Sequence, residues 1–424
     1  MSIHIFPIRI SMFKYLRTLK IIDYFQYFML YCMICFGGGS IPFRLSQDIF
    51  LIFILFTSII IINKRGYILK NITSSYVHYL TILFATYLLI VTTSTLTLGT
   101  SLFAILALAV IYATFLLNPN EFLNRLIQII LFLSLFSLIM FILTRMLGFN
   151  TMVGIFRPIS AVSIARGSES IYSYNFYIYS FVIQHQHRNC GPFGEPGQYQ
   201  CILSVALFFT LFYLNKVTFQ YRILAMIIFV FAIVTTQSTT GYISLVVIIT
   251  AYYIHCNIKK IVDKKMKKAF KYLLLFGIIF FVFTSIGHQF IETTIYDKFD
   301  FRSKEIKASG TARQEGITEA LKVITQYPET LWGVGYDHPI VKSIKSESGL
   351  LIYLIAAGII PFFTLYFYLV RTCFKYSFGV YDAVAKLLVL LNMSLGQPHL
   401  INPILFSMIL YPFFISYKRK NLKK

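Results

Sequence analysis

Arginines and carboxylates gather in three short stretches of the sequence, and the first of them reads Arg188-Asn-Cys-Gly-Pro-Phe-Gly-Glu195-Pro-Gly197. Glycine and proline favour fixed, tight turns, so we expect the loop to hold Arg188 and Glu195 in a defined geometry directly before an apolar run, with Gly197 shaping the turn. A guanidinium can bind a phosphate in a bidentate manner, and a carboxylate can accept a proton. The alternative is that the two residues form a charge pair that only closes the loop.

The second stretch extends from Arg313 to His338. Arg313 falls in the first turn of a predicted helix close to the expected bilayer boundary, where it could bind phosphate or only extend its charged head into the interface. Gly333 and Gly335 permit a close approach of the backbone. No third glycine follows, so this is not a dinucleotide-binding loop, and His338 is a lone histidine for which a structural role is favoured.

The third stretch is Ser346-Glu347-Ser348-Gly349, which directly precedes an apolar run. A carboxylate at the start of a membrane helix is either an anchor at the interface or a functional group, and Glu347 is therefore a candidate. Further along the run, Gly358 and Pro361 predict a loosened or kinked helix.

The composition tells us which elements must position these residues. The chain has 424 residues, of which 57% are apolar and 13% are charged, whereas soluble domains carry about 25% charged residues. Many apolar runs approach the ~20 residues that cross a bilayer core, and only helices satisfy their own backbone there without alternating polarity. We therefore expect an all-α, polytopic membrane protein of about 12 transmembrane helices. The expected spans are 21–36, 48–62, 76–92, 98–117, 123–146, 198–214, 222–236, 240–256, 271–287, 348–370, 382–396 and 401–416.

The basic residues predict which side of the membrane each loop lies on. The net charge of +22 comes largely from a lysine cluster at 259–271, from the first 20 residues and from the C-terminal tail. Because lysine and arginine mark the cytoplasmic side, we assign these segments to the cytoplasm and expect no nucleic-acid partner. Cys32 and Cys35 have a CxxC spacing inside an apolar run without a second pair, so we interpret them as packing residues.

The threading divides the chain into seven parts, with two large external (periplasmic) loops between the membrane helices. The parts are a cytoplasmic arm (1–20), N-terminal membrane helices (21–146), external loop 1 (147–197), central membrane helices (198–287), external loop 2 (288–347), C-terminal membrane helices (348–416) and a cytoplasmic tail (417–424). Within loop 1 the short apolar segment 171–183 is expected to be an interfacial or re-entrant element, because it is too short to span a bilayer.

External loop 2 carries the signature of an amphipathic helix. Thr311 and Gln314 have the spacing of a capping box, apolar residues follow at helical spacing, and Pro328 stops the helix. We expect this helix to lie along the membrane surface.

Taken in order, these stretches resemble the O-antigen polymerase (Wzy) family, which is related to the O-antigen ligases. Arg188 through Gly197 resembles the family's R…G-F-x-E-P-G stretch, and Arg313 through Gly335 resembles its R…P…G-x-G stretch. Residues 235–241 resemble its T-x-S-R-x-G turn without the arginine. Glu347, with Gly358 further on, stands where ligases usually carry a histidine, which favours a polymerase over a ligase.

The resemblance implies a glycosyltransferase at the outer face of the bacterial inner membrane. The twelve expected spans and the basic segments predict that both termini are cytoplasmic. The enzyme would transfer a growing glycan from undecaprenyl pyrophosphate to the non-reducing end of a lipid-linked repeat unit, in the synthesis of O-antigen or a similar surface polysaccharide. Arg188 and Arg313 would bind the pyrophosphate, and either Glu195 or Glu347 would act as the base. Besides these lipid-linked oligosaccharides and the bilayer, a polysaccharide chain-length regulator is an expected partner.

No cofactor is expected, and no metal, because Asp297 and Asp300 lack the spacing of the paired aspartates of metal-dependent sugar-nucleotide transferases. Two alternatives stay open. The chain could be an O-antigen ligase, or it could be a flippase for lipid-linked oligosaccharides. A flippase would show inverted repeats and charged residues deep within the spans, whereas the ionisable residues here crowd into external loops.

Overall fold

The computed structural model describes the chain in separate segments. The described residues are 21–37, 56–57, 110–157, 160–166, 169–174, 178–214, 219–258, 272, 309–334, 338–343, 349–396 and 403–421. These residues are mostly helical. The expected spans 48–62, 76–92 and 271–287, the arm 1–20 and the lysine cluster at 259–271 lie almost wholly outside them, and of the expected span 98–117 only residues 110–117 are described.

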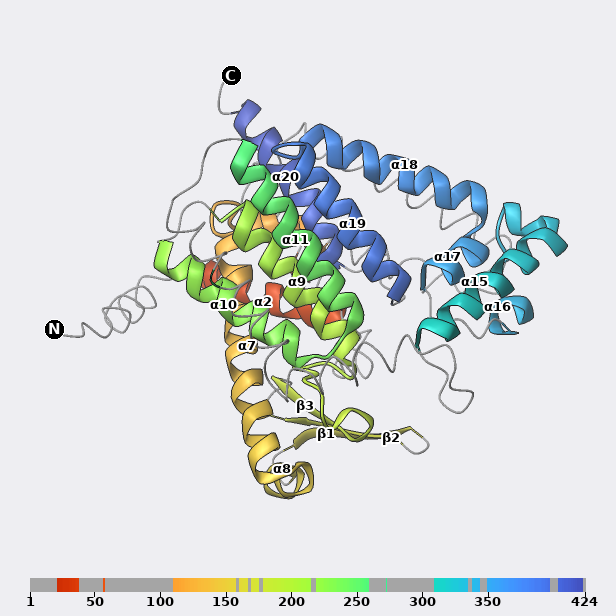
Figure 1. Cartoon of the computed structure of the whole chain (residues 1–424). Coiled ribbons are helices and arrows are strands. Elements are labelled where there is room, and N and C mark those ends of the chain that lie inside the picture. Colours follow the sequence, from red (N-terminus) through yellow and green to blue (C-terminus); the bar gives the residue numbers. More distant parts are fainter. Residues whose placement is uncertain are drawn as a thin grey trace.

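The elements follow the order of Figure 1. The helices are α2 (Ile21–Gly37), α7 (Phe122–Leu147), α8 (Phe149–Phe156), α9 (Pro196–Phe212), α10 (Phe219–Thr235), α11 (Thr239–Ile258), α15 (Ser309–Gln326), α16 (Pro339–Ser343), α17 (Gly349–Ala357), α18 (Ile359–Tyr376), α19 (Val380–Gly396) and α20 (Pro403–Asn421). The strands are β1 (Ser160–Arg166), β2 (Glu169–Tyr174) and β3 (Tyr179–Val182), and the 3₁₀ helices are η2 (Ile183–His185) and η4 (Pro328–Leu331).

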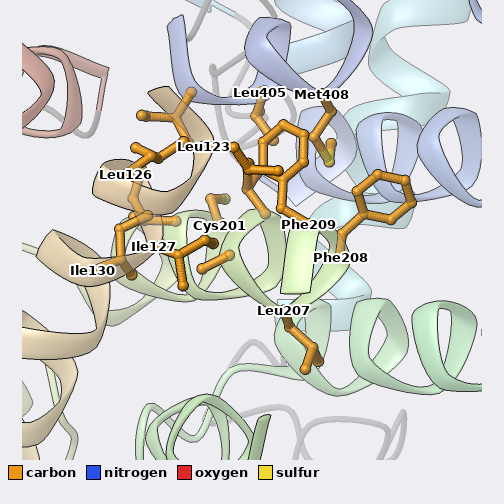
Figure 2. Packing of buried hydrophobic residues seen from close by; sticks show 14 of the residues in the cluster. Leu123, Leu126, Ile127, Ile130, Cys201, Leu207, Phe208, Phe209, Leu405 and Met408 are labelled. Atoms are coloured by element: carbon orange, nitrogen blue, oxygen red, sulfur yellow. The ribbon is translucent and has the colours of Figure 1, made fainter. Parts of the chain in front are cut away.

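Helix α9 forms the centre of the bundle. All of its 17 residues are buried, because its sequence is apolar on every side and contains no charged residue, as expected for a helix enclosed by other helices. Figure 2 shows side chains of α7, such as Leu126 and Ile130, beside Cys201 of α9, and Leu405 of α20 beside Phe209. The core that positions the elements described below therefore runs from α7 through α9 to α20.

Two of the described helices are long and apolar enough to cross a membrane: α7 with 26 residues and α11 with 20 residues. Five of the large exposed side chains on α7 lie three and four residues apart, so they share one face of the helix. They are Phe132, Leu135, Ile139, Ile142 and Met146. A continuous apolar stripe that faces outward is suited to contact with lipid, and these two helices support the assignment as a membrane protein.

Five further helices occupy positions at which the sequence predicts a membrane span. Helices α2, α9, α10, α19 and α20 coincide closely with the predicted spans 21–36, 198–214, 222–236, 382–396 and 401–416. Their ends are joined by side-chain contacts that pair the start of α2 with the start of α7, and the end of α9 with the start of α19. These directions are compatible with the threading that the sequence predicts for the same segments.

The expectation of an all-α chain is wrong in the first loop. Residues 160–182 contain a three-stranded antiparallel sheet in the order β1-β2-β3, and Ile171 pairs with Val182 across β2 and β3. The segment 171–183, predicted to be interfacial or re-entrant, is therefore a β-hairpin that continues into η2. Isoleucine, valine and aromatic residues favour strands once a partner strand is available, and a short apolar run alone does not distinguish these states.

The expected span 348–370 is divided into two helices. α17 ends at Ala357 and α18 begins at Ile359, with Gly358 between them at φ +94°. This backbone conformation is unfavourable for residues with a Cβ atom, so the glycine sets the position of the break. The kink that the sequence predicted at Gly358 is confirmed.

The helix predicted in the second loop is present, but it begins at Ser309, before the predicted cap Thr311, so Arg313 lies in its second turn and not in its first. α15 extends from Ser309 to Gln326, and Pro328 opens η4 directly after it. Its buried residue Ala320 packs with Val334 and with Ile355 of α17 in a small second core. In Figure 1 this group of α15, α16 and α17 lies to one side of the main bundle.

Candidate functional site

Arg188 lies in the loop between β3 and α9 and bonds to the turn between α10 and α11. Its Nε donates to the carbonyl oxygen of Thr236 at 3.0 Å, and its Nη2 donates to that of Gln237 at 3.1 Å. Gln237 has a φ of +50°, which turns the chain sharply at this point. The remaining nitrogen, Nη1, has no hydrogen-bond partner among the residues that the structure describes.

Asn189 fixes the loop from which Arg188 extends. Its Nδ2 donates to the hydroxyl oxygens of Ser137 on α7, at 3.2 Å, and of Thr235 on α10, at 3.0 Å. Its Oδ1 accepts from the backbone of Gly191 at 3.0 Å, and its own backbone nitrogen donates to Thr235. Because Asn189 is fully buried and uses every polar group of its side chain, it holds Arg188 in a rigid setting.

The charge of Arg188 is only partly screened by water. Burial lowers the pKa of its guanidinium, and the neighbouring Cys190, Tyr242 and Glu195 act in the opposite direction. Arginine stays protonated at physiological pH all the same, so the site carries a fixed positive charge. In the same loop, burial raises the pKa of the Cys190 thiol to about 12, which keeps it neutral.

Glu195 immediately precedes α9 and is exposed, with an extended backbone at φ −142°. Its side chain does not cap the helix, and Pro196 takes the first helical position, where its missing N–H costs nothing. The buried Gly197 follows. No ion pair between Arg188 and Glu195 exists within the described part of the chain, so the two charges act through space and not as a closed pair.

The turn that receives Arg188 is the 235–241 stretch singled out in the sequence. Ser238 and Thr240 share a hydrogen bond of 2.9 Å between their hydroxyl groups, and Gln200 of α9 donates to the Thr240 hydroxyl at 3.1 Å. Gly241 lies against Gln200, where a Cβ atom would stand 3.2 Å from that residue's own Cβ. Two motif stretches that lie far apart in the sequence thus form one contiguous unit.

The second loop brings together the glycines of the other two stretches. Gly333, at φ +101°, lies against Gly358, where an added Cβ atom would stand 2.5 Å from the Gly333 nitrogen and 2.3 Å from the Trp332 carbonyl carbon. The backbone nitrogen of Val334 donates to Ile355 at 3.4 Å. These glycines therefore allow the backbone of η4 to approach the break between α17 and α18 closely.

The remaining predicted site residues are described only in part. Arg313 lies within α15, but its side chain is outside the described set, as are Glu347 and Gly335. The convergence of Arg188 with Arg313 stays a prediction. His338 is described, and its Nδ1 accepts from the backbone nitrogen of Ile340 at 3.4 Å, at the start of α16, which agrees with the structural role favoured from the sequence.

Two features of this site were not identified from the sequence. One is the role of Asn189, whose only signal was a polar amide next to an arginine in a glycine-rich loop. The other is a contact of 2.6 Å between Nη1 of Arg145, in the last turn of α7, and Nδ1 of the exposed His187. Arginine can only donate, so Nδ1 is the acceptor in this contact. Both basic groups lie at the same end of α7 as the 188–197 loop.

Comparisons of the chain with protein-family models, with curated proteins and with solved structures find no match.

Proposed function

We propose that this protein is a metal-independent glycosyltransferase that polymerises oligosaccharide repeat units carried on undecaprenyl pyrophosphate. The proposal rests on the resemblance of the sequence to O-antigen polymerases and is supported by one observation. Two of the stretches that carry the resemblance are in direct contact, and this contact fixes a half-buried guanidinium with one unused donor nitrogen.

The proposed reaction needs an anion site and a base. A hydroxyl oxygen of the acceptor repeat unit attacks the anomeric carbon of the donor glycan, and the bond from that carbon to the diphosphate oxygen breaks. The diphosphate leaves with the electron pair, and its growing charge is stabilised by the guanidinium of Arg188, and in the full proposal by Arg313 as well. The hydroxyl proton passes to a carboxylate, Glu195 or Glu347.

Preorganisation is the physical reason for choosing Arg188. Its Nε and Nη2 are held by backbone carbonyls, and Asn189 is bonded to α7 and α10, so the guanidinium need not reorganise when charge develops nearby. Desolvation strengthens its interaction with an anion, because water competes less for the charge. The exposed Glu195 stands within electrostatic reach of this cation and is open to substrate.

We place the protein in the bacterial inner membrane as a multi-pass chain with about 12 spans and both termini cytoplasmic, as the distribution of lysine and arginine predicts. Loops 147–197 and 288–347 would then face the periplasm, where lipid-linked repeat units are joined. A chain-length regulator would be a partner at this face.

The decisive experiment combines a gene deletion with variants of two arginines. Arg222 is a matched control, because its Nε donates to the carbonyl oxygen of Thr210 at 2.8 Å and its Nη2 bonds to Leu211, at the opposite end of the bundle. We expect Arg188→Lys to reduce glycan polymerisation by about two orders of magnitude or more, the cost of losing one preorganised donor at a developing charge. Arg222→Lys should leave the glycan ladder normal.

The readout is a glycan gel together with the amount of protein in the membrane. A deletion strain that retains core with one repeat unit indicates a polymerase, whereas polymer that is made but left unattached indicates a ligase. A normal ladder in both Arg188→Lys and Arg188→Ala cells would refute the assignment of Arg188. In both lysine variants the loss of glycan polymer could match the loss of protein from the membrane. That result would show that Arg188 acts only in folding.

A further inference from the structure

The turn after α15 exposes three apolar or aromatic side chains within six residues of the chain. Tyr327 is 37% exposed, Leu331 44% and Trp332 53%. Trp332 is the only tryptophan in the sequence. An exposed tryptophan next to an exposed leucine presents a large apolar surface to its surroundings, whereas tryptophan is highly buried on average.

The backbone of this turn is fixed against the membrane-helix region and not free to swing. The carbonyl carbon of Trp332 lies so close to Gly358 that a Cβ atom there would be 2.3 Å away, and Val334 donates a hydrogen bond to Ile355 of α17. Val334 itself is buried beside Ile355. The position of the Trp332 backbone is therefore tied to the point at which α18 begins.

Helix α18 presents an apolar outward face that starts at the same point. Ile360, Phe363 and Phe367 are 43%, 60% and 69% exposed and lie three and four residues apart, on one side of the helix. Like the outward stripe of α7, this row of large apolar side chains is suited to lipid and not to water. The η4 turn contacts the backbone at this same point, because Trp332 lies against Gly358, the residue directly before α18.

We propose that Tyr327, Leu331 and Trp332 form an interfacial anchor that lies in the headgroup region of the lipid bilayer. Tyrosine and tryptophan rings favour this depth, because their apolar bodies enter the acyl region while their polar atoms stay hydrated. Such an anchor holds the C-terminal end of α15 at the membrane surface, at the level of the break between α17 and α18. The proposal does not depend on the catalytic role of Arg188.

The native chain is its own reporter, because all indole fluorescence comes from Trp332. The full-length protein is reconstituted into bilayers that contain lipids brominated either near the headgroup or near the end of the acyl chain. We expect bromine near the headgroup to quench the emission more strongly than bromine near the chain end. Aqueous iodide should quench only part of the emission.

A matched variant calibrates the depth. In Trp332→Phe/Phe367→Trp the single indole moves about 14 Å further along α18 from Gly358, at about 1.5 Å per residue. This variant should show the reverse order, with stronger quenching by the deep bromine. Trp332→Phe alone supplies the background without indole.

Two results would overturn the anchor. The first is full quenching of Trp332 by iodide with no response to either brominated lipid, which would place the turn in water. The second is an emission unaffected by brominated lipids that shifts only when soluble glycan fragments are added, which would make the turn a carbohydrate surface.

Discussion

The two ends of the helical bundle use buried charge in different ways. At the end far from the sheet, Arg125 contacts Asp23 at 2.7 Å and Lys386 contacts Asp382 at 3.0 Å, so each cation has a carboxylate partner. At the end next to the sheet, the hydrogen-bond partners of Arg188 among the described residues are neutral backbone carbonyls, and the exposed Glu195 forms no ion pair with it there.

The far end shows what a purely structural solution to buried charge looks like. Lys386 also donates to Tyr213 at 2.5 Å and to Ser377 at 2.8 Å, and Asp382 accepts from the backbone of Phe378 at 2.9 Å. A buried charge is tolerated when an oppositely charged partner and further hydrogen bonds compensate for the lost water. This cluster joins α9, α18 and α19, and its cation is paired with a buried carboxylate.

At the end next to the sheet, the positive charge of Arg188 is not neutralised by the groups that bind it. Carbonyl oxygens can orient a guanidinium, but they cannot neutralise it, so a positive charge remains that an anion could match. The difference between the two ends is therefore the reason to place the candidate site at Arg188 and not at the more deeply buried Arg125 or Lys386.

The largest effect is expected from breaking the buried pair at the far end. Lys386→Met leaves Asp382 charged and alone, which should destabilise the folded protein by about 3–5 kcal/mol. The double variant Asp382→Leu/Lys386→Met removes both charges and should lose less than the single variant. Unfolding of the purified protein in detergent measures both.

The exposed Lys375, at the end of α18, is the control for that comparison. Lys375→Met should change stability by less than about 0.5 kcal/mol, as surface substitutions usually do. Unfolding of Lys386→Met at the same midpoint as the native protein would show that the pair is not structural.

A smaller loss of stability is expected at the break between α17 and α18. There the elements are held together by a close backbone contact and not by charge. Gly358→Ala forces a left-handed conformation and an overlap with the Trp332 backbone, at a cost of about 2–4 kcal/mol. The emission of Trp332 should change as well, since its backbone must move. Denaturant unfolding followed by fluorescence measures both quantities.

Gly154 in α8 is the matched glycine for this test. It has no atom within 4 Å of an added Cβ atom, so Gly154→Ala should be neutral or should stabilise the helix by up to about 1 kcal/mol. Equal stability of Gly154→Ala and Gly358→Ala would contradict the close contact.

The smallest effect on stability concerns the thiol beside Arg188. The pKa of Cys190 is raised by burial to about 12, so its thiolate fraction near neutral pH falls by about three orders of magnitude from an ordinary value of about 9. Maleimide should therefore label Cys190 far more slowly than Cys256, which is less buried. Mass spectrometry of the labelled peptides gives both rates.

The raised pKa of Cys190 also predicts how the stability of the folded protein changes with pH. Because the pKa of the Cys190 thiol is raised in the folded protein, the stability that its neutral form contributes is fully present below the ordinary thiol pKa of about 9 and is lost as pH rises toward 12. Cys190→Ala should remove that part of the alkaline loss of stability. Rapid labelling of Cys190 at neutral pH would show that the Arg188 loop is open.

The local pattern of the sequence was sufficient for most of the described helices. Apolar runs predicted α7, α9 and α11, and the capping pattern with Pro328 predicted α15, because helix formation and helix ends depend on residues a few positions apart. Gly358 predicted a break for the same reason. The burial of Cys32 and Cys35 was also predicted correctly from their apolar surroundings.

The sheet and the setting of Arg188 depended on contacts that no local pattern contains. The hairpin of β2 and β3 needs a partner strand, and an isolated apolar segment does not reveal one. Arg188 is held by carbonyls of residues 236 and 237, 48 and 49 positions away. The sequence could nominate the arginine and the carboxylates as chemistry-bearing groups. Only the packing of α7, α9 and α10 decided that this guanidinium is fixed, half-buried and not closed by a carboxylate, because hydrogen-bond partners and desolvation are properties of the assembled fold.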